Sequence, residues 1–174
     1  FHMHGLGAGI NGALTAGASM VVLPRFAPPA VVEAVAACDA TMFFAVPTMY
    51  ALLRDADALP ALRGLRLLVS GSAPLDPVLF ADVAATAGQA PVERYGMSET
   101  VMLTSNPVRG ERRAGSVGLP LPGVQVRLVA ENRLQDLDRE RIDIAIRYCP
   151  PAIAGRGATK LFGDSAPGAR QEVL

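Results

Sequence analysis

The chain has 174 residues, of which 51% are hydrophobic and 18% are charged; this composition predicts a globular core and excludes a disordered chain. Sixteen basic residues balance sixteen acidic ones, so no net charge draws the chain to nucleic acid or to an anionic membrane. We therefore expect neither nucleic acid nor a membrane as a partner.

Cysteine use and hydropathy suggest the compartment. Cys38 and Cys149 lie far apart without metal-ligand spacing, which favours buried, inert thiols in a reducing environment. Arg25 and Pro28 interrupt the most apolar stretch before it reaches the length of about 18 residues needed to cross a bilayer. We predict a cytoplasmic protein. Because the sequence begins at Phe1 in mid-pattern, we also expect a further segment upstream.

The first hundred residues alternate short apolar runs with longer stretches of helical period. This pattern predicts an α/β fold, a partial doubly wound and mostly parallel sheet built from βαβ units. The predicted strands are residues 19–23, 41–46, 66–70 and 92–95. Ligands of such sheets bind beyond the carboxyl ends of the strands, so the loops that follow these strands are the candidate site.

The predicted helices have recognisable ends. Two prolines open the helix at residues 28–38, and Thr48 is a candidate cap for a short helix to Arg54. Asp76 caps a third helix over residues 78–87, and Gly88 ends it. Later in the chain we expect a loop over residues 104–122, a half-exposed strand at 124–130, a helix at 134–141 and a strand at 142–147.

Two of the loops carry candidate binding residues. The turn after the strand at 66–70 contains Ser70, Gly71, Ser72, Ala73 and Pro74, whose small side chains let a planar ring or a phosphate approach the backbone. Taken alone, this turn is weak evidence for a site and is better explained as a tight connection from a strand to a helix.

The second loop follows the strand at 92–95. An aromatic face there can cover a base, a hydroxyl can bind phosphate, and a carboxylate is the oxygen ligand that magnesium prefers beside phosphates. The alternative is a helix start capped by a serine. The residues of this loop are Tyr95, Gly96, Met97, Ser98, Glu99 and Thr100.

Four segments together resemble one family. They are FHMHGLGAGINGAL at residues 1–14, SGSAPL at 70–75, ERYGMSET at 93–100 and SNPVRGERRAGSVGLPLPGV at 105–124. In this order they resemble the adenylate-forming acyl-CoA synthetases, and within them the malonyl-CoA ligases, over residues 1–129. The resemblance implies an ATP- and Mg²⁺-dependent ligase with coenzyme A as co-substrate and a short carboxylic acid, malonate above all, as the acid.

The resemblance also implies residue roles. SGSAPL would line the adenine pocket, Tyr95 would stack on the base, Glu99 would bind Mg²⁺, and Thr100 would contact phosphate, so that Glu99 and Thr100 are the candidate catalytic residues. His2 and His4 would lie near the acyl site, although a structural role for either histidine is an equal alternative.

Arg94 is our own candidate for selecting a dicarboxylic acid. A guanidinium can hold a second carboxylate through two hydrogen bonds. The alternative is an ordinary ion pair with Glu93 or Glu111.

Other parts expected of a complete ligase are missing from this sequence. Adenylation needs a glycine-rich phosphate loop, a ribose-binding aspartate and a late catalytic lysine. The only lysine, Lys160, lies in GATKLFGD, which does not match the context of the catalytic lysine. We therefore expect no ligase turnover from this chain alone. The alternatives to a ligase fragment are a module that still binds a nucleotide or an effector, or a remnant with no selected function.

The last part of the chain resembles a different family. Residues 131–164 resemble the effector-binding domain of LysR-type transcription regulators. We therefore predict two parts, a synthetase-like segment at 1–129 and a regulator-like tail at 130–174. Because the sheet would stop short, we also expect an open edge through which copies of the chain could associate.

Overall fold

The computed structural model describes residues 3–126, 147–149, 160–162 and 171–173. The chain divides into two compact units, Phe1–Val126 and Arg127–Leu174. The second unit contains the short strands β6 (Arg147–Cys149), β7 (Lys160–Phe162) and β8 (Gln171–Val173), which form an antiparallel sheet in the order β6-β8-β7. The candidate site lies in the first unit.

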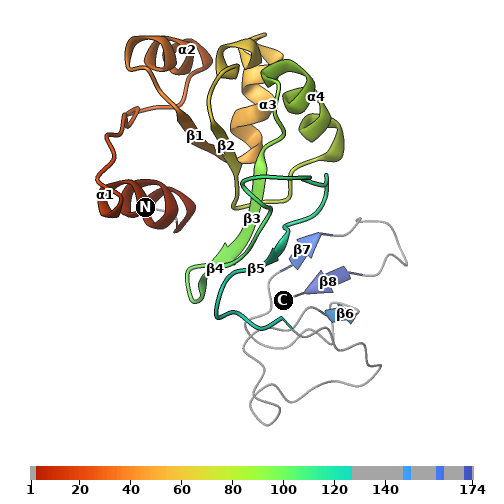
Figure 1. Ribbon diagram of the computed structural model, residues 1–174. Coiled ribbons are helices and arrows are strands. Elements are labelled where there is room, and N and C mark those ends of the chain that lie inside the picture. Colours follow the sequence, from red (N-terminus) through yellow and green to blue (C-terminus); the bar gives the residue numbers. More distant parts are fainter. Residues whose placement is uncertain (1–2, 127–146, 150–159, 163–170, 174) are drawn as a thin grey trace. The chain divides into compact units, whose positions relative to one another are not determined.

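A five-stranded sheet organises the first unit, in the order β1-β2-β3-β4-β5 (Figure 1). Strands β1 (Met42–Ala45), β2 (Leu67–Ser70) and β3 (Val92–Met97) are parallel. Strands β4 (Val101–Ser105) and β5 (Leu119–Pro120) continue the sheet in antiparallel pairing. The predicted α/β fold is therefore confirmed, as a mixed sheet whose parallel part has three strands.

Two helices connect the parallel strands. Helix α3 (Pro47–Asp55) joins β1 to β2, and α4 (Pro77–Ala87) joins β2 to β3; Figure 1 shows them side by side. Since right-handed crossovers between neighbouring parallel strands place their helices on the same face, both cover one face of the sheet. Helix α2 (Pro28–Ala37) and the 3₁₀ turn η2 (Leu59–Leu62) pack on the same core.

The core lies between the sheet and these helices. Its largest fully buried side chains include Tyr50, Leu53, Leu62 and Leu68. The Tyr50 hydroxyl donates to the carbonyl of Val69 at 3.1 Å, so α3 is tied to β2 by a buried hydrogen bond as well as by packing.

Successive residues of β1 point to opposite faces, as expected for a strand. Phe43 packs towards the core, where its ring meets Tyr50 edge to face at 5.7 Å. Phe44 instead meets the ring of His4, which belongs to the N-terminal π-helix η1 (Met3–Asn11). Helix α1 (Gly12–Thr15) continues η1. The sheet therefore has a core face and a second face on which His4 lies.

The signals at helix ends are largely confirmed. The Asp76 carboxylate accepts from the N–H groups of Val78 and Leu79 at 2.9 and 3.1 Å, and Gly88 has the left-handed φ of 79° expected at a helix end. Thr48 was predicted wrongly as a cap. Helix α3 begins at Pro47 and its N-cap is Val46, so Thr48 already lies in the first turn.

Four further predictions differ from the structure within the described residues. Residues 19–23 form no strand, and Val21 and Val22 are 54% and 65% exposed. The predicted loop at 104–122 contains the end of β4 and all of β5, and residues 124–126 of the predicted strand at 124–130 are not extended in a sheet. Cys38 is exposed instead of buried.

Several predictions fall elsewhere in the chain. The helix predicted at 134–141 and nearly all of the strand predicted at 142–147 lie outside the described residues, as does most of the regulator-like segment. Within the described residues β1 has no strand on its outer side, and self-association through that edge stays a prediction. No helix among the described residues is long and apolar enough to cross a membrane.

Candidate functional site

The turn after β2 is anchored at both ends and exposed in the middle. Ser70 is 1% exposed, and the N–H of Gly71 donates to the carbonyl of Ala45 at 3.3 Å. At the other end Leu75 is 1% exposed. Between them Ser72, Ala73 and Pro74 are exposed, and Ser72 has a left-handed φ of 73°. The middle of this turn is therefore exposed, and ligand binding there stays a prediction.

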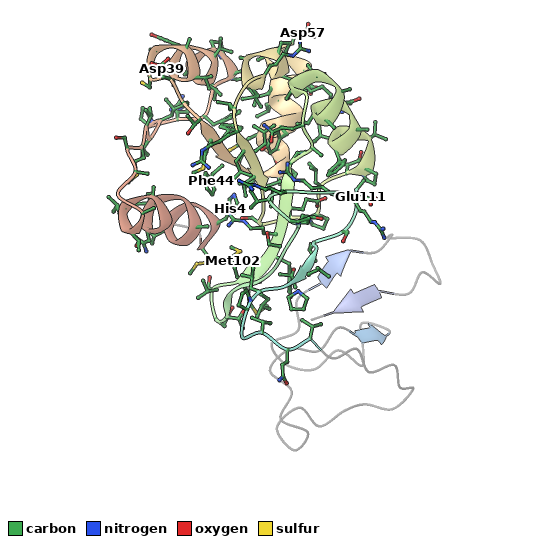
Figure 2. The ribbon with its side chains drawn as sticks, viewed as in Figure 1. His4, Asp39, Phe44, Asp57, Met102 and Glu111 are labelled. Carbon is green, nitrogen blue, oxygen red and sulfur yellow. The ribbon has the colours of Figure 1, made fainter. Side chains whose placement is uncertain are left out.

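Gly71 allows a close approach. A Cβ placed there would stand 2.5 Å from Nδ1 of His4, nearer than van der Waals contact permits. His4 is 4% exposed and lies against both this turn and Phe44, which Figure 2 shows beside it. The structure thus brings His4 against the turn at 70–75, and its expected place near an acyl site stays a prediction. His2 lies outside the described residues.

The ERYGMSET motif forms a hairpin. Its first half is the end of β3, residues Ser98, Glu99 and Thr100 make the turn, and β4 starts at Val101. The turn is closed by the N–H of Thr100, which donates to the carbonyl of Met97 at 3.3 Å. The alternative of a helix start at Ser98 is therefore wrong.

Gly96 lies within the strand, at an irregularity in the pairing between β3 and β4. A Cβ on Gly96 would stand 2.0 Å from the carbonyl oxygen of Val101. Glycine is needed here because the opposite backbone occupies the space of a side chain. The sequence analysis assigned Gly96 to a loop, and the structure places it instead at a close backbone contact inside the hairpin.

The side chains of the hairpin differ in exposure. Ser98 and Glu99 are exposed at its tip, where an oxygen ligand is accessible. Tyr95 and Thr100 are partly buried, and burial raises the pKa of the Tyr95 hydroxyl. One hairpin turn therefore carries the exposed Glu99 together with the partly buried Tyr95 and Thr100.

Arg94 and Glu93 point to opposite faces of β3, because they are consecutive residues of a strand. The Arg94 guanidinium lies over the Phe44 ring at 5.5 Å, on the face where His4 lies, and burial lowers its pKa. Glu111 pairs with Arg113 at 3.3 Å. Neither ion pair proposed as the alternative for Arg94 occurs in the structure.

Glu93 was not singled out by sequence reasoning. It is 3% exposed, and its Oε2 accepts from the N–H of Leu75 at 3.1 Å. Burial raises the pKa of its carboxyl group, and the backbone N–H groups of Leu75 and Gly115 partly oppose that rise. No clear sequence signal singles it out, because β3 also contains the charged Arg94 and the polar Tyr95.

Buried polar atoms without partners gather in one part of the described structure. Such atoms are rare in native proteins and call for an explanation. Apart from Ser70 at the end of β2, the residues concerned all belong to the β3–β4 hairpin. The atoms are Ser70 Oγ, Glu93 Oε1, Arg94 Nε and Nη2, Tyr95 Oη, Thr100 Oγ1 and Thr104 Oγ1.

Within the described residues, no group of three His, Cys, Asp or Glu side chains lies close enough together to hold a metal ion. Magnesium does not need such a cluster, since it commonly binds through one or two carboxylates together with substrate phosphates. The exposed carboxylate of Glu99 fits that mode of binding.

Comparison with known proteins agrees with this arrangement. Residues 1–142 match the family of AMP-binding enzymes. The mitochondrial malonate–CoA ligase of Mus musculus is 40% identical over 147 residues, which cover 75% of this chain and 25% of that protein. The oxalate–CoA ligase of Arabidopsis thaliana is 37% identical over 133 residues, covering 70% and 25%.

Solved structures give the same result. A malonyl-CoA ligase in a ternary product complex with methylmalonyl-CoA and AMP is 42% identical, with a TM-score of 0.69, covering 85% of this chain and 32% of that one. The ATP-bound MatB protein of Rhodopseudomonas palustris is also 42% identical, with a TM-score of 0.62, covering 70% and 24%.

The fold thus corresponds to an α/β portion of the acyl-CoA ligases to which the chain is similar. The chain belongs to the family of AMP-binding enzymes, and its relatives include malonyl-CoA ligases. It spans about a quarter of the length of the curated relatives. The family match continues to residue 142, beyond the limit of 129 expected from the motifs, and so overlaps the start of the regulator-like segment.

Proposed function

We propose that this chain carries the nucleotide-facing and acid-facing part of an ATP-dependent ligase that joins malonate or a similar short acid to coenzyme A. The observation that carries the proposal is the gathering of unpartnered buried polar atoms on Ser70 and on the β3–β4 hairpin. A polar ligand bound there would supply the missing partners, which removes the cost of burying them.

The proposed nucleotide site uses both loops. The exposed backbone of Ser72, Ala73 and Pro74 would face the adenine, and Ser70 and Gly71 would form the buried base of the same turn. On the hairpin, the Tyr95 ring would stack on the base, with Gly96, Met97 and Ser98 shaping the bend beside it. This division suits a planar ring held between a backbone surface and an aromatic side chain.

The proposed phosphate site uses the tip of the hairpin. Thr100 Oγ1 is buried without a partner and would donate to a phosphate oxygen. Glu99 would hold Mg²⁺ together with the phosphates, and the ion when bound would neutralise charge that develops on them. Glu99 and Thr100 would thus be the catalytic residues of this part of the enzyme.

The proposed acid site lies on the other face of β3. The Arg94 guanidinium is held by the Phe44 ring and not by a carboxylate, so two of its nitrogen atoms remain for a carboxylate of the acid. The His4 ring contacts the Phe44 ring and would border the same space, with His2 as the neighbouring candidate. A monocarboxylic acid offers Arg94 no second carboxylate, and this favours malonate.

Calorimetric titration of the purified chain with ATP and MgCl₂ tests the nucleotide half of the proposal. We expect measurable binding that weakens in Tyr95→Ala and Thr100→Val and is unchanged in Arg109→Gln, which alters an exposed surface residue. Absence of any heat for ATP in the wild-type chain would remove nucleotide binding by this chain.

The acid half needs a separate titration with malonate and with butyrate, followed by NMR. We expect malonate to shift resonances around Arg94 and butyrate to have a smaller effect, with the difference lost in Arg94→Gln. The Arg109→Gln variant again serves as control. Equal responses to malonate and butyrate in the wild-type chain would contradict the role of Arg94. No thioester formation is expected from the chain alone.

A further inference from the structure

Glu93 stands at the meeting point of the two loops assigned above to the nucleotide. Its Cα pairs with that of Ser70 across β2 and β3, so its side chain lies on the core face beside the start of the turn after β2. Its Oε2 accepts from the N–H of Leu75, at the end of the same turn, at 3.1 Å. The carboxylate therefore bridges from β3 to the far end of the turn.

The backbone of Glu93 fixes a second segment. Its carbonyl oxygen accepts from the N–H of Asn106 at 2.9 Å and lies 3.5 Å from Asn106 Nδ2. Asn106 is 4% exposed and donates from Nδ2 to the carbonyl of Ser116. The N–H of Gly115 also stabilises the Glu93 carboxylate. Asn106 and the segment at Gly115 and Ser116 are thus linked to the same position of β3.

Burying the Glu93 carboxylate costs free energy that a purely structural contact would not require. A buried carboxylate normally has a cation beside it, yet the ion pairs among the described residues do not include Glu93. Its Oε2 accepts from Leu75, whereas its buried Oε1 accepts no hydrogen bond of ordinary geometry. An apolar side chain would fill the same volume without desolvating a charge, so the carboxylate is best explained by the N–H groups it holds.

What it holds is a turn under strain. Ser72 adopts a left-handed φ of 73° without being glycine, a conformation that persists only where the surroundings impose it. The β2 ladder and the Gly71–Ala45 hydrogen bond hold the turn on one side of Ser72. On the other side, the contact between Leu75 and Glu93 precedes the cap of α4 at Asp76.

We propose that Glu93 is the positioning residue of the nucleotide site, holding the turn at 70–75 and the Gly115 segment in register with the β3–β4 hairpin. The inference rests on the proposed function for its link to nucleotide, but the arrangement of the loops can be tested without any ligand.

The test is amide hydrogen exchange by NMR on the full 174-residue chain. In Glu93→Ala we expect exchange at the Leu75 and Gly115 amides to accelerate about tenfold or more, the size expected for losing a hydrogen bond to a charged group. Amides of core residues Leu68 and Val83 should keep their wild-type protection. Glu93→Gln retains one acceptor and should restore the slow exchange at Leu75, at least in part.

Glu111→Ala is the matched control, because Glu111 is exposed and pairs only with the exposed Arg113. Its exchange pattern should equal that of the wild type. Unchanged exchange at Leu75 and Gly115 in Glu93→Ala, or equal acceleration throughout the core, would overturn the positioning role. Should Glu93→Ala fail to fold, the same comparison is made on Glu93→Gln, where loss of the negative charge should leave exchange at Leu75 and Gly115 faster than in the wild type.

ATP titration of the same variants separates the two proposals. If the wild-type chain binds ATP, Glu93→Ala should weaken binding at a temperature where it remains folded, and unchanged affinity would overturn the link to nucleotide. If the wild-type chain does not bind ATP, the proposed function fails for this chain. The exchange pattern then still decides whether Glu93 holds the two loops.

Discussion

Replacing Gly96 by alanine should damage the hairpin of the candidate site more than any exposed glycine substitution. The new Cβ would stand 2.0 Å from the Val101 carbonyl oxygen and 2.8 Å from the Met102 Cα. Both are backbone atoms of β4, so no side-chain rotation can relieve the contact. To restore ordinary contact at 3.4 Å the strands would have to separate by about 1.4 Å, and we expect a loss of about 1 to 3 kcal/mol in unfolding free energy.

Urea unfolding followed by circular dichroism measures this loss. Gly5→Ala is the matched control, since nothing lies within 4 Å of a Cβ at that position. Its unfolding free energy should be unchanged or raised by up to about 1 kcal/mol, because alanine restricts the unfolded chain. Equal unfolding free energies for the two variants would refute the argument that β4 occupies the side-chain space of Gly96.

Three other changes have calculable effects on unfolding by urea. Asp76→Ala should cost about 1 kcal/mol by removing the cap of α4, and no loss would show that Val78 and Leu79 find other acceptors. Tyr50→Phe should cost about 1 to 2 kcal/mol by removing the buried hydrogen bond to β2, with an unaltered m-value. Folding raises the pKa of the Glu93 carboxyl group above its usual value of 4.5. As the pH rises from 4.5 through that higher pKa, the unfolding free energy of the wild type should therefore fall relative to that of Glu93→Gln. A difference in unfolding free energy that stays constant between pH 4 and 8 would contradict this.

The parts of the fold that the sequence predicted are those with local causes. Helix α4 carries its own start and stop signals in Asp76 and Gly88, and the structure uses both. The apolar run at residues 19–23 has the right composition for a strand, but a strand also needs a hydrogen-bonding neighbour. Composition cannot show whether a strand lies beside residues 19–23, and within the described residues no strand pairs with them.

The residues of the candidate site could be proposed from the sequence, but their geometry could not. The small residues after Ser70 and the hydroxyl and carboxylate after Met97 indicated ligand-facing loops from residue chemistry alone. The hairpin was not predicted, because the antiparallel pairing of β3 with β4 depends on contacts between residues on the two sides of the turn. A sequence pattern of strands followed by helices does not show such contacts. Glu93 was missed for a related reason: its partners, Leu75 and Gly115, are both distant in sequence.

The division of Glu93 and Arg94 between two faces of β3 predicts that their roles are separable. The pKa of Glu93 responds to burial and to backbone N–H groups, and that of Arg94 to burial, so neither group is shifted by the charge of the other. Glu93 contacts the turn at 70–75, whereas Arg94 contacts Phe44. Without a shared partner, the two substitutions should act independently on stability.

A double-mutant cycle measures that independence. The changes in unfolding free energy for Glu93→Gln and Arg94→Gln should add in the double variant to within about 0.5 kcal/mol. The ligand responses should also separate, with the first variant altering exchange at Leu75 and the second altering only the response to malonate. A coupling clearly above that limit would mean that the two charges act as a buried pair, and the assignment of one face to nucleotide and the other to acid would then fail.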